Sequence, residues 1–278
     1  MPVLSLRTFL VSGLIAGLVA GVVAFAVAYT VGEPAVRDAI AIEEAGSSAA
    51  ADDGHTHDHA SDGSAAEEPH SHGDEEGGIT RTTQETTGLL TGLLVLGTAF
   101  GGLLGIVAAY AVGRLGALRP LAGTALVGLL AFVAVALVPW LLFPPNPPAV
   151  GSGDTIDERT AQYFSVLLVS VVAAFAAVSF ARALHRAGRG YLGVTIAGVG
   201  YLVVVLGMAL VLPRESEVPA DFSADVLYGF RISSLLTQAA LWATATLVLT
   251  ALIARRQSAA GSSPVEPHPS SVETSTAR

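Results

Sequence analysis

The chain has 278 residues, of which 52% are apolar and 13% are charged, and its formal charge is −9. It contains no cysteine and no lysine, which excludes disulfides, thiolate metal sites and thiol nucleophiles, and also the lysines of nucleotide-binding P-loops and of Schiff bases. The excess of negative charge also argues against nucleic acid as a partner.

The apolar residues fall into six long runs, each close to the roughly 20 residues that a helix needs to cross a hydrocarbon core of about 30 Å. We therefore predict an all-α, polytopic integral membrane protein with about six transmembrane helices. The first run extends from Phe9 to Val31, which is longer than the apolar part of a signal peptide, so we interpret it as a retained span.

The predicted organisation follows the chain in order. Residues 1–31 form the first span with a short cytoplasmic N-terminus, 32–87 an extracytoplasmic acidic loop rich in histidine, 88–256 the rest of the bundle, and 257–278 a disordered cytoplasmic tail. The later spans are expected at 88–112, 121–143, 161–184, 191–212 and 232–253.

Arginine placement predicts the orientation. Cytoplasmic flanks of membrane helices are enriched in positive charge, and six spans put one set of arginines on a single side and most carboxylates on the other. That set is Arg7, Arg114, Arg119, Arg182, Arg186, Arg189, Arg255 and Arg256. We expect both termini in the cytoplasm and a multi-pass protein of the plasma membrane.

Glycines recur every four residues in the first two spans. Such spacing lets helix backbones approach closely in lipid, and we favour packing within one bundle over a dedicated dimer contact. The glycines are Gly13, Gly17 and Gly21 in the first span and Gly97, Gly101 and Gly105 in the second.

The loop after the first span carries the strongest functional signal. Glu33 and Pro34 are typical of a helix start, so we expect a short helix on the outer surface before the low-complexity segment. That segment holds five of the seven histidines, among many carboxylates: His55, His57, His59, His70 and His72.

Neutral imidazole binds divalent transition metals, and alternate residues of an extended chain point the same way, so the first three histidines can converge on one ion. We predict a weak metal-capture site whose affinity falls below about pH 6.5 as imidazole is protonated. The alternative is an acidic, solvated linker in which the histidines are incidental.

Few residues inside the spans could carry chemistry, and no nucleophile with a base is visible, so we do not expect an enzyme. We interpret Arg231 as an interfacial anchor rather than a path-lining residue, and Trp140 as part of the aromatic belt. Pro139 is expected to kink the third span.

The order of these features resembles the predicted cobalt transporter subunit family CbtA. The resemblance rests on the glycine-rich first span, the Glu33–Pro34 pair, the histidine loop, and the strings RTTQETTG (81–88), FPPNPP (143–148) and DERTAQYF (157–164). It covers most of the chain, from Phe9 to about Ile253. That family typically has a glutamate where this chain has Asn146.

The resemblance implies a membrane subunit of a divalent transition-metal uptake system. The ion would be Co²⁺, with Ni²⁺ or Zn²⁺ as alternatives, carried rather than permanently bound as a cofactor. Besides lipid and the metal ion, it implies a small one-span partner of the CbtB type. The alternative function is a non-transporting metal-binding or assembly subunit that serves a separate permease.

Overall fold

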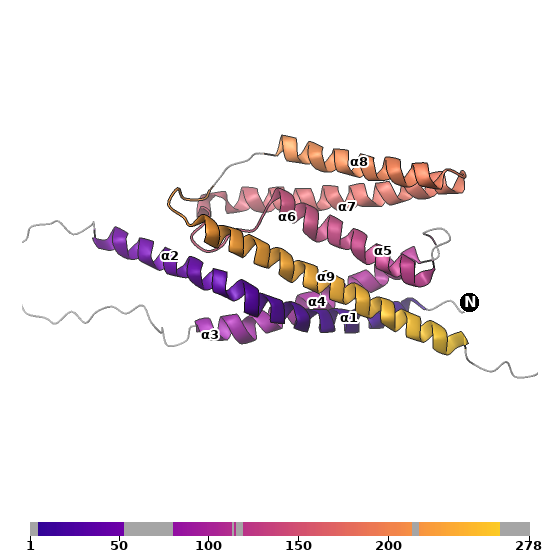
Figure 1. The fold of residues 1–278 in the computed structure, drawn as a ribbon, viewed down its shortest axis with the longest axis horizontal. Coiled ribbons are helices and arrows are strands. Elements are labelled where there is room, and N and C mark those ends of the chain that lie inside the picture. Colours follow the sequence, from indigo (N-terminus) through magenta and orange to yellow (C-terminus); the bar gives the residue numbers. More distant parts are fainter. Residues whose placement is uncertain (1–4, 53–79, 113, 115–118, 213–216, 262–278) are drawn as a thin grey trace, which may run out of the picture.

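A computed structural model describes residues 5–52, 80–112, 114, 119–212 and 217–261 of the chain. Within these ranges six helices are long and apolar enough to cross a membrane, and no strand occurs. They run side by side along the long axis of the molecule (Figure 1). The prediction of an all-α, polytopic membrane protein with about six transmembrane helices is therefore confirmed.

The first two long helices contain short π-helical turns. The first consists of α1 (Leu6–Val27), the π-turn η1 (Ala28–Gly32) and α2 (Glu33–Asp52). The second consists of α3 (Arg81–Thr83), the π-turn η2 (Gln84–Gly88) and α4 (Leu89–Ala111).

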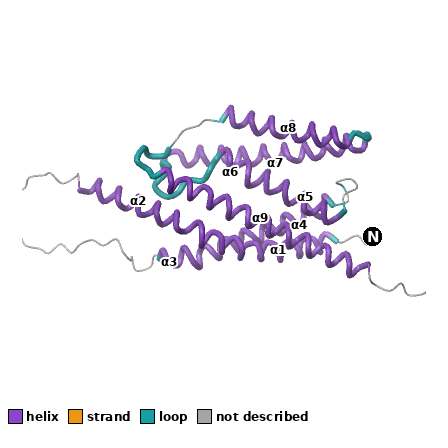
Figure 2. The backbone as a smooth tube through the Cα atoms, in the orientation of Figure 1, coloured by secondary structure: helices purple, strands orange, loops and turns teal. Residues whose placement is uncertain are grey.

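The remaining four long helices complete the bundle. The third is formed by α5 (Pro120–Phe132), the π-turn η3 (Val133–Leu137) and α6 (Val138–Leu142). After the 3₁₀ turn η4 (Gly153–Thr155) come α7 (Ile156–Arg186), α8 (Gly190–Val211) and α9 (Ala224–Gly261). Figure 2 shows the longer described loops at one end, between α6 and α7 and before α9.

The expected helix that starts at Glu33 is present as α2, but it is not a separate element, because α1, η1 and α2 follow one another without a break. A proline inside an α-helix clashes with the carbonyl four residues earlier. The π-turn relieves this: the Glu33 N–H bonds to the carbonyl of Ala28, five residues back, directly before Pro34. A second π-turn precedes Pro139, where the Val138 N–H bonds to the carbonyl of Val133.

α1 and α4 approach so closely that only glycine fits between them. A Cβ added to Gly17 would lie 2.1 Å from the carbonyl oxygen of Gly97, and one added to Gly101 would lie 2.3 Å from that of Gly13. The expected glycine packing within one bundle is thus confirmed. α9 packs across this pair through buried apolar side chains that include Leu249 and Ile253.

The two ends of the bundle differ in charge. The "arginine end" comprises the starts of α1, α5 and α8 and the ends of α4, α7 and α9, with the arginines predicted to share one side, and it lies where the N-terminus is marked in Figure 1. The opposite "acidic end" carries α2, α3, the loops after α6 and α8, and most carboxylates. There Ala39 of α2 packs with Val150 and Phe222 of these loops, which ties α2 to the bundle.

The glycine contact gives a direct test. We expect Gly101→Ala to lower the free energy of unfolding by about 1–3 kcal/mol, because the methyl group forces two backbones apart. Unfolding in detergent micelles by titration with sodium dodecyl sulfate measures the change. Gly92→Ala in the same helix is the matched control, since nothing lies within 4 Å of its added Cβ. Equal stability of the two variants would contradict this account of the α1–α4 contact.

Candidate functional site

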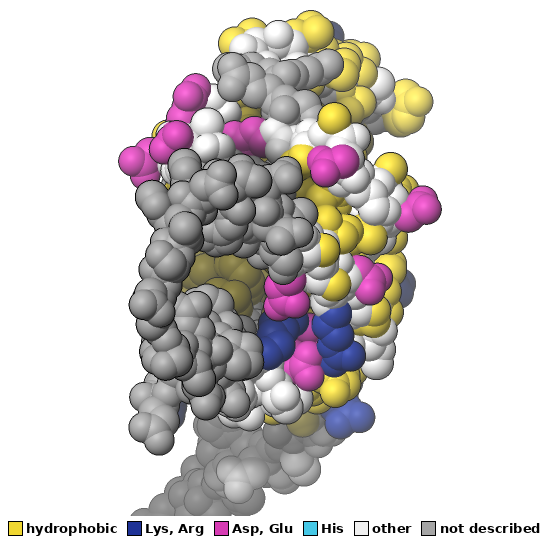
Figure 3. Space-filling view, turned by 90° about the vertical axis from the view of Figure 1, so that its left-hand side faces the viewer, with side chains coloured by type: hydrophobic (Ala, Val, Ile, Leu, Met, Phe, Trp, Pro, Cys, Tyr) yellow, Lys and Arg dark blue, Asp and Glu magenta, His cyan; other side chains and the backbone are white. Residues whose placement is uncertain are grey.

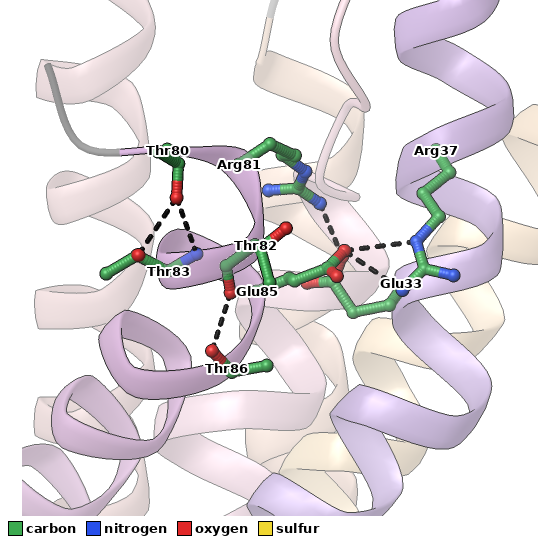
Figure 4. Close-up of polar contacts among 8 residues, drawn as sticks. All are labelled: Glu33, Arg37, Thr80, Arg81, Thr82, Thr83, Glu85 and Thr86. Atoms are coloured by element: carbon green, nitrogen blue, oxygen red, sulfur yellow. Dashed lines mark hydrogen bonds and ion pairs between the residues drawn. The ribbon is translucent and has the colours of Figure 1, made fainter. Parts of the chain in front are cut away.

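Two ion pairs join the chain on either side of the histidine loop. Arg81 of α3 pairs with Glu33 of α2, and Arg37 Nη2 of α2 lies 2.9 Å from Glu85 Oε2 of η2 (Figure 4). We call these four residues the double ion pair. Thr80 fixes the start of α3, because its hydroxyl accepts a hydrogen bond from the Thr83 N–H at 3.3 Å. The start of α2 is therefore held to α3 and η2, and α2 continues from Arg37 to Asp52 before the histidine segment begins.

The spacing of these four residues in the sequence also predicts ion pairs, but between different partners. Glu33 and Arg37 are four residues apart, and so are Arg81 and Glu85, which is the spacing of ion pairs within one helix. In the structure each arginine instead pairs with the carboxylate of the other helix. Only the three-dimensional arrangement brings these groups together, because 48 residues separate the partners.

The five predicted metal-capture histidines lie within residues 53–79, outside the described residues. They are His55, His57, His59, His70 and His72. Within the ranges that the structure does describe, no group of three or more His, Cys, Asp or Glu side chains could hold a metal ion. The capture site accordingly stays a prediction, and the helices themselves offer no second one of this kind.

A cavity of about 1060 Å³ opens at the acidic end beside the double ion pair. Its wall includes Glu33, and it continues along α6, α7 and α9. Figure 3 looks onto this end, where carboxylates are spread over the face and arginines sit beside carboxylates in one group. The polar side chains that line the cavity include Asn146, Thr155, Glu158, Arg159, Thr160, Gln162, Glu217, Arg231, Ser233, Ser234, Thr237 and Gln238.

Arg231 lies in the wall of this cavity. Its Nη2 donates a hydrogen bond to Asn146 Oδ1 at 3.0 Å, while its Nε is shielded from solvent and has no partner among the described residues. Trp140 Nε1 donates to the Arg231 carbonyl and to Ser234 Oγ, both at 3.1 Å. Arg231 and Trp140 thus belong to one hydrogen-bond network between α6 and α9. The interpretations of Arg231 as an interfacial anchor and of Trp140 as part of the aromatic belt stay predictions.

A third ion pair lies in the wall of the cavity. Arg159 Nη1 of α7 lies 2.7 Å from Glu217 Oε2, and the Thr155 hydroxyl donates to the same carboxylate. The Thr155 hydrogen bond holds the pKa of Glu217 below its ordinary value of 4.5, with Arg159 acting in the same direction. Gly151, at a φ of 123°, leaves room for Arg159, since a Cβ there would lie 2.7 Å from Nη1.

The charges at the acidic end are therefore unevenly balanced. Of the arginines described there, Arg37, Arg81 and Arg159 each have a carboxylate partner, whereas Arg231 bonds to a neutral amide. Several exposed carboxylates remain outside the described ion pairs, namely Asp38, Glu43, Asp154, Asp157, Asp221 and Asp225. The rim is acidic and the inner wall at Arg231 is positive.

These features define a polytopic α-helical membrane protein with a polar cavity open at its acidic end. A protein-family model, described as "Probable cobalt transporter subunit (CbtA)", matches residues 6–254. The chain therefore belongs to this family of probable cobalt transporter subunits. Neither the curated proteins nor the solved structures contain a match to the chain.

The double ion pair predicts unequal effects of removing its carboxylates. We expect Glu33→Gln to lower the free energy of unfolding by about 1–3 kcal/mol, because Glu33 is buried and Arg81 loses a charged acceptor. Glu85→Gln should cost less, about 0.2–1 kcal/mol, because its partner Arg37 is exposed. Unfolding in micelles measures both. Asp38→Asn, an exposed carboxylate of the same helix, is the control, and a Glu33→Gln effect no larger than that of Asp38→Asn would refute the assignment.

The lowered pKa of Glu217 predicts a pH dependence. A carboxyl group whose pKa is lowered by folding stabilises the protein above its unfolded-state pKa, near 4.5, and loses that effect as pH falls through the folded-state pKa. Wild type should therefore melt at a higher temperature than Glu217→Gln at pH 7, and the gap should close as pH falls below about 4.5. Asp221→Asn in the same loop is the control. A gap that stays constant down to pH 3 would exclude the Thr155–Glu217 contact as its source.

Proposed function

We propose that this chain is the membrane subunit through which a divalent transition metal, cobalt in the first place, enters the cell. In this proposal the histidine loop collects the ion and delivers it to the cavity at the acidic end. The observation that carries it is the position of Glu33, which both joins the two sides of the loop through Arg81 and lines the cavity. An ion released from the loop would reach the cavity without leaving this end of the protein.

The electrostatics of the acidic end favour arrival of a cation. Exposed carboxylates outside ion pairs, such as Asp154 and Asp157 near the rim, raise the local concentration of cations. The loop adds further carboxylates and the five histidines His55, His57, His59, His70 and His72. Imidazole is the side chain here with the greatest affinity for Co²⁺, Ni²⁺ and Zn²⁺, since the chain has no cysteine.

Passage beyond the rim is opposed by the guanidinium of Arg231, which repels a divalent cation in the inner part of the cavity. The driving force must compensate for this barrier. With the positive-inside orientation that the arginines predict, an inside-negative potential of 100 mV favours entry of a divalent cation by about 4.6 kcal/mol. Inward transport is the direction that this field supports.

A second function is favoured by the same barrier. Because the described residues contain no group of three or more metal-ligating side chains and Arg231 is positive, the chain can instead collect metal without conducting it. It would then be a metal-binding or assembly subunit that serves a separate permease. A small one-span partner of the CbtB type, implied by the resemblance, could complete either arrangement.

Uptake by the purified chain separates the two functions. We expect proteoliposomes that contain this chain alone to take up radiolabelled Co²⁺ saturably, with Ni²⁺ and Zn²⁺ as competitors. Replacing the five loop histidines by alanine should reduce the initial rate about fivefold at low Co²⁺ and much less at saturation, because the loop acts through local concentration. His185→Ala, at the arginine end, is the matched control and should leave uptake unchanged.

Two other results of this uptake experiment would support a different conclusion. Binding of Co²⁺ without uptake, lost in the five-alanine variant, would support the accessory subunit. Uptake that the five alanine substitutions leave unchanged at every Co²⁺ concentration would overturn the role of the loop histidines.

A further inference from the structure

A second cavity, of about 710 Å³, separates α5 from the hairpin of α7 and α8 at the arginine end. α7 packs against η3 and α6 nearer the acidic end, and α8 packs against α7, whereas α5 diverges from the hairpin toward the arginine end (Figure 1). The walls of this cleft are apolar or small, as at Leu130, Val133 and Val194. Its deep end lies beside Tyr201, whose hydroxyl is hydrogen-bonded to Ser170 Oγ at 2.8 Å.

The mouth of the cleft is basic. Arg114, Arg182 and Arg186 all line it, and none of the ion pairs among the described residues involves them. The segments that line the cleft bring no acidic residue to it, because residues 86–153 and 159–214 contain neither aspartate nor glutamate. The Nε of Arg182 is shielded from solvent and lacks a hydrogen-bond partner in the described part of the chain. Among the described residues, the mouth therefore has guanidinium groups without a carboxylate partner, which can bind an anion.

The depth of the cleft matches one leaflet of a bilayer. It extends from Arg186 to Ala174 along α7 and from Gly190 to Tyr201 along α8. At 1.5 Å per residue these stretches measure roughly 16–18 Å, which is about half of the 30 Å hydrocarbon core. Basic groups thus lie at the end of the spans where lipid headgroups are, and the apolar part reaches toward the midplane.

We propose that this cleft binds an anionic phospholipid, with the headgroup phosphate on Arg114, Arg182 and Arg186 and an acyl chain between α5 and the α7–α8 hairpin. Arginine forms bidentate hydrogen bonds with phosphate, and basic pockets between membrane helices on the cytoplasmic side suit anionic headgroups. A free anion would leave the apolar part of the cleft unfilled. An acyl chain fills it and stabilises the hairpin against α5.

Native mass spectrometry of the full chain in detergent, with dioleoyl phosphatidylglycerol or dioleoyl phosphatidylcholine added, tests this proposal. We expect one phosphatidylglycerol to bind with clear preference over phosphatidylcholine. The double variant R182A/R186A should weaken this binding about 25-fold, since each arginine near an anionic headgroup contributes roughly fivefold. R255A/R256A is the matched control, because it removes the same charge from the arginine end at exposed positions outside the cleft.

A second variant tests the apolar part and keeps every arginine. Gly198 lines the cleft, and a Cβ added to it meets nothing within 4 Å, so Gly198→Leu fills the space without a backbone clash. It should also weaken phosphatidylglycerol binding while leaving the helical circular dichroism unchanged. Four results would each overturn the proposal. Two concern the arginines: equal binding of the two lipids, or equal losses in R182A/R186A and R255A/R256A. The other two are undiminished binding by Gly198→Leu and full displacement of the lipid by inorganic phosphate.

Discussion

The close contact of α1 with α4 is the interaction on which the arrangement of the bundle depends. Lipid tails provide no hydrophobic driving force between helices, so association relies on van der Waals packing, and glycines let the two backbones touch. α9 lies across this pair and buries Leu249 and Ile253 against it. That packing fixes where Arg231 and Ser234, nearer the start of α9, meet Trp140 of α6. The cavity at the acidic end is thus a consequence of contacts made elsewhere in the bundle.

Charge is organised by the same geometry. The arginine end holds basic groups with no acidic residue between 86 and 153 or between 159 and 214, whereas at the acidic end Arg37, Arg81 and Arg159 are paired with carboxylates. Pairing those arginines leaves the other carboxylates as a net negative rim, which suits a protein that receives cations. The guanidinium of Arg231, which has no carboxylate partner among the described residues, opposes the negative potential of the rim inside the cavity. Its effect on a cation therefore bears on whether the chain conducts metal or delivers it to a separate permease.

Two prolines show how the structure accommodates a residue that disfavours the interior of a helix. Pro34 was expected to start a new helix and Pro139 to kink one, because proline removes a hydrogen bond and collides with the preceding turn. In both places a π-turn comes directly before the proline and shifts the hydrogen bond to a carbonyl five residues back. The helix therefore continues through each proline, and α2 extends the first long helix at the acidic end instead of forming a separate surface element.

The sequence by itself determined that the chain is a helical membrane protein with about six spans, and the order of its motifs indicated its family, because span length and arginine placement depend only on local composition. It also indicated the glycine packing of α1 and α4, since a four-residue repeat marks one face of a helix. Tertiary structure alone decided that Glu33 pairs with Arg81, that Arg231 lines a cavity, and that a basic cleft separates α5 from α7. These features join residues far apart in the chain, and their distances follow from how helices pack, which no local pattern encodes.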